Sequence, residues 1–340
     1  MKNCVEIILN WYRENKRDLP WRKDIDPYHV WISEIMLQQT RIDAVIDYYE
    51  KFMNRLPSIK DLSEISEDEL LKLWEGLGYY SRARNLKKAA VLIMEKYHGV
   101  FPNTYDEILS LPGIGEYTAG AIASICFQLK EVAVDGNVMR VYSRVQDLDI
   151  DVSDLKVKKK VGEEIKKILP EESGEFNQGI MELGEVICLP NGEPKCELCP
   201  LKSRCMAFLN KRQTLIPRKI KKMEKLEEEY TLFLMKYNNK YALRKRDGGL
   251  LKNMWEFPNK EGFYTYDEVK EIIPNIKTIQ LGITNTHIFT HKKWFMNSYY
   301  LEVSKMDLNY SWFTIEEIEN NLALPSAFTP FLEYIKKCQN

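Results

Sequence analysis

The apolar pattern of this chain changes near residue 206, and that change limits how the chain can fold. Before it, apolar residues recur with helical spacing, and Gly or Pro separates successive helical segments. After it, runs such as 230-YTLFLMKY-237 are rich in β-branched and aromatic residues and end in turn signals. A chain of 340 residues is long enough for two cores. We expect an all-α domain, a linker and an α+β domain over residues 1–206, 207–229 and 230–340.

With 44% hydrophobic residues, 29% charged residues and a formal net charge of −1, the composition is that expected of an ordinary soluble protein. The longest apolar run, 118-TAGAIASICF-127, is too short to span a bilayer. The N-terminus reads as an amphipathic helix without a secretory signal. The segment 211–225 carries seven Lys or Arg against one Glu, and a solvated linker explains it better than a nucleic-acid contact. We expect a monomer in the cytoplasm, associated with the nucleoid in a prokaryote.

Four of the seven cysteines lie in one short stretch, 188-CLPNGEPKCELCPLKSRC-205. Disulfides are rare in intracellular proteins, which leaves zinc or an iron–sulfur cluster. Zinc sites usually combine two short cysteine pairs, or cysteine with histidine, whereas this stretch has one short pair and no histidine. The spacing therefore favours a 4Fe-4S cluster over zinc. The predicted ligands are Cys188, Cys196, Cys199 and Cys205.

The stretch 111-LPGIGEYTAGA-121 joins a helix ending near Ser110 to a helix beginning near Glu116. Gly113 and Gly115 permit positive φ and leave backbone N–H groups open to a phosphate. The following helix adds its positive N-terminus to the same place. A tight corner between two helices, without any ligand, explains the same residues, so the pattern alone leaves both interpretations open.

Two carboxylates stand out from their surroundings. Glu34 has Val30, Trp31 and Leu37 as helical neighbours, and a carboxyl group on such an apolar face should have a raised pKa. A protonated carboxyl near neutral pH is what a general acid requires, although most single glutamates on helices are simply solvated. Asp135 precedes a helix in 134-VDGN-137, where its simplest role is that of an N-cap.

Several separated motifs, in the same order along the chain, closely resemble the adenine DNA glycosylases of the MutY family. These enzymes belong to the helix–hairpin–helix base-excision superfamily that includes endonuclease III. The resemblance is close over about residues 5–205 and loose over 230–335, where the chain is similar to the Nudix (MutT-like) fold. It implies an N-terminal helix–hairpin–helix glycosylase domain with an iron–sulfur cluster loop and a C-terminal α+β Nudix-like domain. The motifs are 28-YHVWISEIMLQQT-40, 76-GLGYYSRARNL-86, 111-LPGIGEYTAG-120, 134-VDGNVMRV-141 and the cysteine loop.

The resemblance also implies a reaction. Glu34 would protonate adenine, at N7, while Asp135 would stabilise an oxocarbenium-like sugar and Asn137 would hold the aspartate or the sugar. Whether water attacks directly or after a covalent adduct stays open. Bifunctional relatives carry a lysine where this chain has Tyr117, and tyrosine cannot form the Schiff base that strand cleavage needs. Tyr117 could instead position the sugar or Asp135, or be a packed aromatic residue at a helix start.

The implied function is that of a monofunctional glycosylase that removes adenine mispaired with 8-oxoguanine or guanine in duplex DNA. One alternative is an endonuclease III-like glycosylase/lyase acting on thymine or other pyrimidines. A second alternative, from another class, is an iron–sulfur redox module that binds DNA without excising a base.

The same resemblance nominates residues that contact DNA or the extruded base. Extruding a base from the duplex costs roughly a few kcal/mol of lost stacking. Leu77 and Tyr79 would fill the gap, and Arg82 would lie near phosphates. Gln39 and Thr40 are nominated at the end of the Glu34 helix, and Trp21, Arg22 and Glu182 are nominated for the adenine pocket.

The C-terminal domain of the family reads 8-oxoguanine through a Phe-Ser-His motif, which this chain carries as Phe289, Thr290 and His291. Threonine keeps the hydroxyl group and adds a methyl group that can alter the contact. His291 also fits a strand-end histidine with a local partner. No paired-glutamate helix follows 255-WEFP-258, so hydrolysis of free nucleotides is not expected. The seven-residue spacing after Cys188 is one longer than expected, and a loop can absorb one residue.

Overall fold

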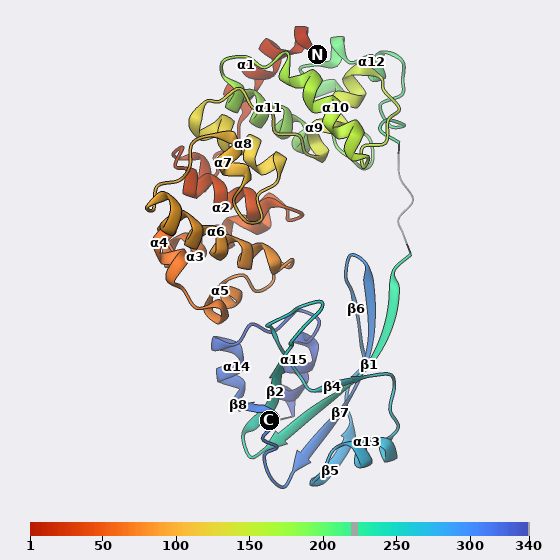
Figure 1. Ribbon diagram of the computed structural model, residues 1–340. Helices are drawn as coiled ribbons and strands as arrows, with labels where there is room; N and C mark the ends of the chain where they lie inside the picture. Colours follow the sequence, from red (N-terminus) through yellow and green to blue (C-terminus); the bar gives the residue numbers. More distant parts are fainter. Residues whose placement is uncertain (219–223, 339–340) are drawn as a thin grey trace. The chain divides into compact units, whose positions relative to one another are not determined.

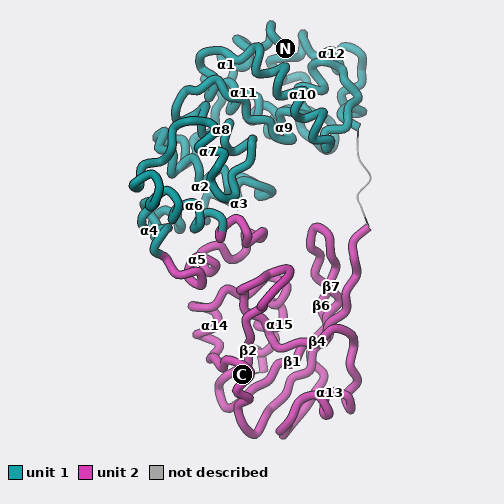
Figure 2. The backbone as a smooth tube through the Cα atoms, viewed as in Figure 1, with its two compact units in different colours: residues 1–64, 85–221 teal, residues 65–84, 222–340 magenta. Residues whose placement is uncertain are grey.

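The computed structural model describes residues 1–218 and 224–338, which form two compact units. Unit 1 comprises Met1–Glu64 and Asn85–Lys221, and unit 2 comprises Ile65–Arg84 and Lys222–Asn340 (Figure 2). Residues 219–223 of the predicted linker lie outside the described part of the chain. The expected order, an all-α region followed by an α+β region, is confirmed.

Unit 1 is helical throughout its described residues (Figure 1). Polar caps start several of its helices; Asp26, for example, accepts a hydrogen bond from the Tyr28 backbone N–H at the start of α2. Short 3-10 turns cover Lys2–Cys4, Pro20–Arg22, Cys196–Leu198 and Lys202–Arg204. The helices are α1 (Val5–Asn15), α2 (Pro27–Leu37), α3 (Ile42–Arg55), α4 (Ile59–Glu64), α6 (Ser81–Tyr97), α7 (Tyr105–Leu109), α8 (Glu116–Phe127), α9 (Gly136–Gln146), α10 (Leu155–Lys166), α11 (Ser173–Val186) and α12 (Met206–Leu209).

Helix α11 organises the core of unit 1, because it packs against α1, α8 and α9. A small residue lets α11 approach α9 closely at Gly184, where an added Cβ would lie 2.6 Å from the Asn137 Cβ. Phe176, Ile180 and Leu183 of α11 are buried in the same apolar cluster as residues of α1 and α9. This packing fixes Asn137 and its neighbours against α11.

Unit 2 contains a mixed sheet that, among the described residues, has the strand order β3-β2-β1-β7-β5. The long strands β1 and β7 run parallel, with Leu226 opposite Lys292 and Lys236 opposite Glu302. Strands β4, β6 and β8 pair with β1, β7 and β2, respectively. The strands are β1 (Leu226–Tyr237), β2 (Lys240–Lys245), β3 (Trp255–Glu256), β4 (Asn259–Glu261), β5 (Ile276–Leu281), β6 (Asn285–Ile288), β7 (Lys292–Val303) and β8 (Ser311–Phe313).

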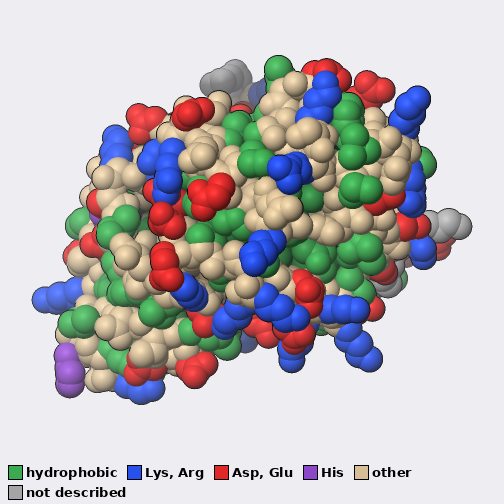
Figure 3. Space-filling view, turned by 90° about the horizontal axis from the view of Figure 1, so that it is seen from above, with side chains coloured by type: hydrophobic (Ala, Val, Ile, Leu, Met, Phe, Trp, Pro, Cys, Tyr) green, Lys and Arg blue, Asp and Glu red, His purple; other side chains and the backbone are tan. Residues whose placement is uncertain are grey.

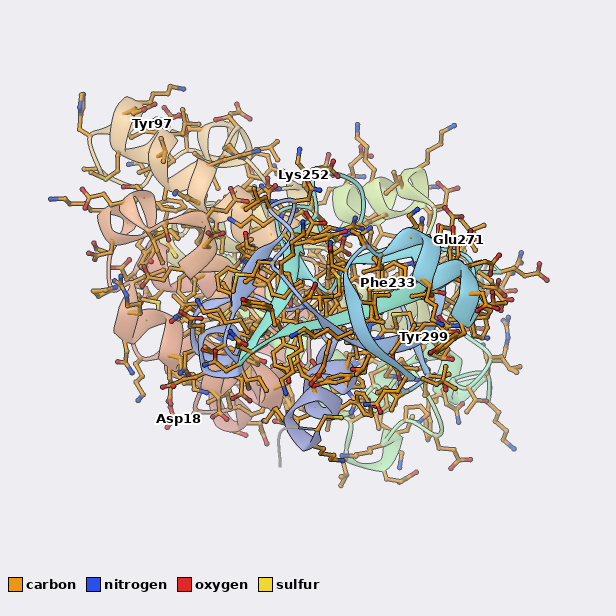
Figure 4. The ribbon with its side chains drawn as sticks, turned by 90° about the horizontal axis from the view of Figure 1, so that it is seen from below. Asp18, Tyr97, Phe233, Lys252, Glu271 and Tyr299 are labelled. Atoms are coloured by element: carbon orange, nitrogen blue, oxygen red, sulfur yellow. The ribbon has the colours of Figure 1, made fainter. Side chains whose placement is uncertain are left out.

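The two faces of this sheet are covered by different helices. Side chains alternate along β1, so Leu232 joins the core with α14 (Ile315–Asn321) and α15 (Thr329–Lys337), whereas Phe233 joins the core with α13 (Tyr266–Ile272). Phe233 pairs with Tyr299 across β1 and β7, and both are labelled beside α13, which carries Glu271, in Figure 4.

The segment Ile65–Arg84 lies within the helical part of the sequence but belongs to unit 2. It contains α5 (Glu67–Leu73), and its polar groups bond to C-terminal residues. Lys72 Nζ donates to the Leu322 carbonyl at 3.0 Å, and the Leu324 N–H donates to Glu75 Oε1 at 2.8 Å. Lys245 forms an ion pair with Asp68 at 2.7 Å. Of the helices in the described residues, none has the length and apolarity needed to cross a bilayer.

Candidate active site

A cavity of about 1130 Å³ in unit 1 gathers residues that the sequence analysis nominated separately. Its walls come from the N-terminal loop, α2, α8, α9 and α11. The nominated residues that line it are Trp21, Arg22, Glu34, Gln39, Thr40, Tyr117, Asp135, Asn137 and Glu182.

Glu34 lies on α2, where it is only 8% exposed. Its Oε2 accepts a 2.7 Å hydrogen bond from the hydroxyl of Tyr117 on α8. Burial raises the pKa of Glu34 to about 7; the Tyr117 hydrogen bond opposes this, the charge of Asp135 adds to it, and Arg22 opposes it. The glutamate is therefore about half protonated near neutral pH, as the apolar helical face predicts.

Asp135 serves as the N-cap of α9 and also faces the cavity. Its Oδ1 accepts from the Val138 backbone N–H at 2.7 Å, and its Oδ2 accepts from the Asn137 amide at 2.8 Å. Burial raises the pKa of Asp135, whereas these hydrogen bonds and the charge of Arg140 oppose the rise. Because donors satisfy both oxygens, the side chain is held as a hydrogen-bonded carboxylate whose capping role and position on the cavity wall are compatible.

Arg140 supports this arrangement, although the sequence analysis did not nominate it. Its Nη2 donates to Asn137 Oδ1 at 2.7 Å and to the Gly184 carbonyl at 2.8 Å, and its Nε donates to the Cys188 carbonyl at 2.7 Å. With its oxygen engaged by a guanidinium, Asn137 must direct its amide N–H₂ group toward Asp135. The orientation of the asparagine is thus determined by α9 and α11 together.

A second glutamate, Glu182, lines the same cavity and has two arginine partners. Glu182 on α11 is 2% exposed and binds Arg17 Nε at 2.6 Å and Arg22 Nη2 at 2.8 Å. Burial alone would raise the pKa of Glu182, but hydrogen bonds and charges from Arg17 and Arg22 outweigh burial and lower it. Arg17 also pairs with Glu185 at 3.0 Å. Arg17 was not nominated, because its partner lies 165 residues away.

The other nominated cavity residues occupy the rim or the walls. Trp21 is 6% exposed and packs edge-on against Tyr49, with 5.2 Å between ring centroids. Gln39 follows α2 with a φ of 61°, in the left-handed region that side chains other than glycine seldom adopt. Thr40 is half-buried. Such a backbone at the cavity edge is consistent with a binding role.

The predicted hairpin lies between α7 and α8. Gly113 has a φ of 80°, and a Cβ there would lie 2.6 Å from the Asn85 Cβ, so glycine is required. Gly115 is the N-cap of α8 with a φ of −102°, and it adopts no positive φ. Acidic and basic side chains are interspersed on the face seen in Figure 3, and the phosphate contact expected of the hairpin stays a prediction.

The loop 76–80 and the segment 289–291 both belong to unit 2 and meet there. Tyr79, 43% exposed and with a φ of 47°, shares a hydrogen bond between its hydroxyl and that of Thr290. Phe289 packs against Trp294, with 4.7 Å between ring centroids, and His291 is exposed. The sequence nominated these residues in two separate motifs, and the structure joins them through two hydroxyl groups.

Leu77 and Arg82 of the same loop face inward. Leu77 is 6% exposed and Arg82 is 8% exposed. Arg82 Nη2 donates to the carbonyls of Leu77 and Gly78 at 2.9 and 3.1 Å, so its guanidinium holds the loop. The DNA contacts expected of Leu77 and Arg82 stay predictions.

The four clustered cysteines line one small cavity of about 20 Å³. Cys188 Sγ accepts a 3.2 Å hydrogen bond from Arg144, which is 4% exposed. Within residues 1–218 and 224–338, no three His, Cys, Asp or Glu side chains are placed to hold a metal ion. The donor set nevertheless fits a cluster with four thiolate ligands, since all four thiols border one cavity and a guanidinium lies against one sulfur.

Comparisons with known proteins agree with this geometry. Residues 32–171 match the model of the HhH-GPD superfamily base excision DNA repair proteins, and residues 230–334 match that of the NUDIX domain. The chain is 37% identical over 345 residues to the adenine DNA glycosylase of Buchnera aphidicola subsp. Baizongia pistaciae, covering 98% of this chain and 96% of that protein. This chain belongs to the adenine DNA glycosylase family.

More distant members of the adenine DNA glycosylase family align as well. The mouse adenine DNA glycosylase is 33% identical over 383 residues, covering 92% of this chain and 74% of that protein. A solved thermostable thymine-DNA glycosylase is 31% identical with a TM-score of 0.56, covering 62% of this chain and 96% of that chain. An endonuclease III–DNA complex, 24% identical with a TM-score of 0.54, shares the fold over 62% of this chain.

Proposed function

We propose that this chain hydrolyses the N-glycosidic bond of adenine mispaired with 8-oxoguanine or guanine in duplex DNA and leaves the strand intact. The observation that carries the proposal is the 2.7 Å hydrogen bond from Tyr117 to Glu34 on a cavity wall that Asp135 shares. Membership of the adenine DNA glycosylase family supports adenine as the base.

Glu34 acts as the general acid in this proposal. A pKa of about 7 leaves a large protonated fraction near neutral pH and a proton that can be given up readily. Delivered to N7 of an adenine in the cavity, that proton neutralises the charge that would otherwise develop on the departing base. The Tyr117 hydrogen bond holds Oε2, which leaves Oε1 to carry the proton toward the base.

Asp135 acts on the sugar as the base departs. Positive charge develops at the anomeric carbon in an oxocarbenium-like transition state, and a nearby carboxylate stabilises it. Hydrogen bonds from Val138 and Asn137 favour the ionised form of Asp135 that this role needs. Arg140 fixes Asn137 and thereby keeps the carboxylate from rotating away. The same carboxylate could form a covalent adduct or assist a water molecule.

Tyr117 accounts for an intact strand. The pKa of its hydroxyl is raised well above its usual value, first by burial and then by the charges of Glu34 and Asp135. A hydroxyl that keeps its proton donates to Glu34 and cannot act as an amine nucleophile. Base removal without Schiff-base chemistry follows.

Unit 2 supplies recognition of the partner base in this proposal. The Tyr79–Thr290 hydrogen bond joins the loop expected to enter the duplex to the residues expected to read 8-oxoguanine. A base bound near Phe289 and Thr290 would therefore act on Tyr79 directly. An enzyme of this kind works on chromosomal DNA, so a nucleoid-associated cytoplasmic location is part of the proposal.

Cys188, Cys196, Cys199 and Cys205 would hold a 4Fe-4S cluster. When bound, the cluster supplies a rigid cross-link between the end of α11 and α12, a structural role. Iron measured by elemental analysis, with absorption in the visible blue, supports this assignment, and zinc at the same stoichiometry contradicts it.

Single-turnover assays on duplexes with one 8-oxoguanine:adenine, guanine:adenine or thymine-containing mispair test the proposal. Release of adenine, with strand breaks only after alkali, supports it. Strand breaks without alkali, or a borohydride-trapped adduct, favour the endonuclease III-like alternative. Duplex binding without release of any base favours the redox-module alternative.

A further inference from the structure

The segment that is expected to read 8-oxoguanine lies in the turn between β6 and β7, beside the start of β1 (Figure 1). Two hydrogen bonds tie this turn to the residue before β1 and to the first residue of that strand. Lys225 Nζ donates to the Phe289 carbonyl at 2.6 Å, and the Leu226 N–H donates to the His291 carbonyl at 3.0 Å. The carbonyls on both sides of Thr290 are therefore held by donors from outside the turn.

The aromatic ring of Phe289 is also held in place. It packs edge-on against His287 and Trp294, with 4.5 and 4.7 Å between ring centroids. His287 and Trp294 are opposite each other in the β6–β7 pairing, so the ring contacts both strands of the hairpin. The Phe289 N–H donates to the Lys292 carbonyl at 2.8 Å. The hairpin thus holds the ring and the N–H of Phe289, and Lys225 binds the remaining polar group, the carbonyl.

The side chain of Lys225 has no carboxylate partner in the part of the chain that the structure describes. Two acidic residues of β1, Glu227 and Glu228, pair with Lys293 and Lys292 instead. Lys225 is the last residue of the basic stretch 211–225, to which the proposed reaction assigns no role. An ammonium group donates a stronger hydrogen bond to a carbonyl than a neutral donor does. The contact with the turn is therefore the interaction that orders this exposed side chain.

We propose that Lys225 is a positioning residue for the recognition of 8-oxoguanine. By holding the Phe289 carbonyl, its ammonium group limits the orientations of the peptide that joins Phe289 to Thr290. The Thr290 hydroxyl, which also shares a hydrogen bond with Tyr79, is then presented in one conformation. A binding segment that is already ordered loses less entropy when its ligand arrives. The inference rests on the proposed function, in which unit 2 recognises the partner base.

A contact between Lys225 and a DNA phosphate is the competing explanation. An ammonium group has three N–H donors, and the Phe289 carbonyl uses one of them. A phosphate contact acts on every duplex alike, because phosphates carry no information about the base. Positioning of the turn acts on the duplex that contains 8-oxoguanine. The two explanations therefore predict different outcomes for damaged and undamaged duplexes.

Single-turnover base release from 8-oxoguanine:adenine and guanine:adenine duplexes tests the proposal on the full-length protein. Methionine keeps most of the length of the lysine side chain but removes the ammonium group. We expect the preference for 8-oxoguanine:adenine to fall about fivefold in Lys225→Met, with base release from guanine:adenine little changed. Lys225→Arg retains a cationic donor and should keep most of the preference. The matched control is Lys277→Met, which removes an exposed lysine of β5 and should behave like the parent protein.

Hydrogen exchange of the DNA-free proteins measures positioning without any reaction. The Leu226 and Phe289 amides donate to carbonyls of the same hairpin, so their exchange reports how often the turn opens. We expect peptides that contain these amides to exchange about threefold faster in Lys225→Met than in the parent protein. The Tm should stay the same, and Lys277→Met should exchange like the parent protein.

Unchanged exchange, or an unchanged preference in Lys225→Met, overturns the inference. An equal loss of base release from both duplexes, with weaker and less salt-dependent binding of an undamaged duplex, overturns it in favour of a phosphate contact. A parent protein without any preference contradicts the proposed recognition by unit 2 and the inference with it. A parent protein with the preference and a Lys225→Met variant that keeps it contradict only the inference about Lys225.

Discussion

Two buried glutamates line the same cavity and differ in protonation. Glu182 is 2% exposed and Glu34 is 8% exposed, yet the pKa of Glu182 is lowered and that of Glu34 is raised to about 7. The partners explain the difference, since Glu182 faces two guanidinium groups and Glu34 faces a neutral hydroxyl. Burial sets the cost of a charge, and the nearest donors decide whether that cost is offset.

This contrast divides the cavity into two regions with different tasks. The region of Glu34, Tyr117 and Asp135 holds a transferable proton beside a carboxylate. The region of Glu182, Arg17 and Arg22 holds an ionised carboxylate whose two oxygens accept hydrogen bonds from two guanidinium groups.

The largest expected effect comes from Glu34→Gln. Because general acid catalysis contributes up to about 10⁴-fold, we expect single-turnover base release to fall by about 1000-fold or more. The pKa of Glu34 is raised, so the folded protein keeps a proton that the unfolded chain has lost, and stability falls as pH rises from 4.5 to about 7. The glutamine side chain does not ionise, so the free energy of unfolding of Glu34→Gln should not fall in this way as pH rises.

The Tm of Glu34→Gln at pH 8 should therefore equal or exceed that of the parent protein. Glu175→Gln is the control, since Glu175 lines the same cavity but pairs with Arg13 at 39% side-chain exposure. Normal base release in Glu34→Gln would remove Glu34 from the mechanism.

Asp135→Asn ranks next. Loss of one stabilising charge at the sugar should slow base release by about 100- to 1000-fold. Asparagine caps helices as well as aspartate does, so the Tm should change little. Equal losses of activity and stability would show that Asp135 acts only as the cap of α9.

Glu182→Gln should act mainly on stability and binding. It leaves Arg17 and Arg22 without their buried counter-ion, at an expected cost of about 2 to 3 kcal/mol in free energy of unfolding. Since the pKa of Glu182 is lowered, its stabilisation is present above pH 4.5 and is lost as pH falls through the folded-state pKa. Chemical denaturation should show the full difference in free energy of unfolding at pH 7 and a smaller difference as the pH is lowered below 4.5.

Thr290→Val tests whether the Tyr79–Thr290 hydrogen bond contributes to recognition of 8-oxoguanine. Removing the hydroxyl breaks the hydrogen bond with Tyr79, and we expect the preference for 8-oxoguanine:adenine over guanine:adenine to fall by about fivefold. Thr290→Ser keeps the hydroxyl and serves as the control, with a preference like that of the parent protein. A fall of the same size in both variants would mean that the methyl group matters and the hydroxyl does not.

Tyr117→Phe should have the smallest effect at neutral pH, a few-fold change in base release. The Tyr117 hydrogen bond lowers the pKa of Glu34, so its loss should move the alkaline limb of the pH–rate profile to higher pH. No borohydride-trapped adduct should form in either protein. A limb that moves to lower pH would contradict the assigned hydrogen bond.

Local patterns in the sequence were enough to predict the helical order and the β-rich C-terminal region, whereas most of the nominated cavity residues, among them Trp21, Arg22 and Glu182, came from the resemblance to the MutY family. Glu34 could be found because its helical neighbours are apolar. The position of Asp135 before a helix predicted only an N-cap, and its role at the sugar came from the resemblance.

Arg17 could not be found from local patterns, because its partner Glu182 lies 165 residues away, and the contacts that tie Arg140 to the end of α11 also depend on the tertiary fold, since Cys188 lies 48 residues away. The place of Ile65–Arg84 in unit 2 also depends on long-range contacts, since α5 has the same helical pattern as its neighbours.

The pH dependence of single-turnover base release from an 8-oxoguanine:adenine duplex tests the central claim most directly. If Glu34 must be protonated, the rate constant should fall about tenfold per pH unit above a midpoint near 7. A rate constant that stays flat, or rises, from pH 7 to pH 9 would contradict the claim that a protonated Glu34 starts the reaction.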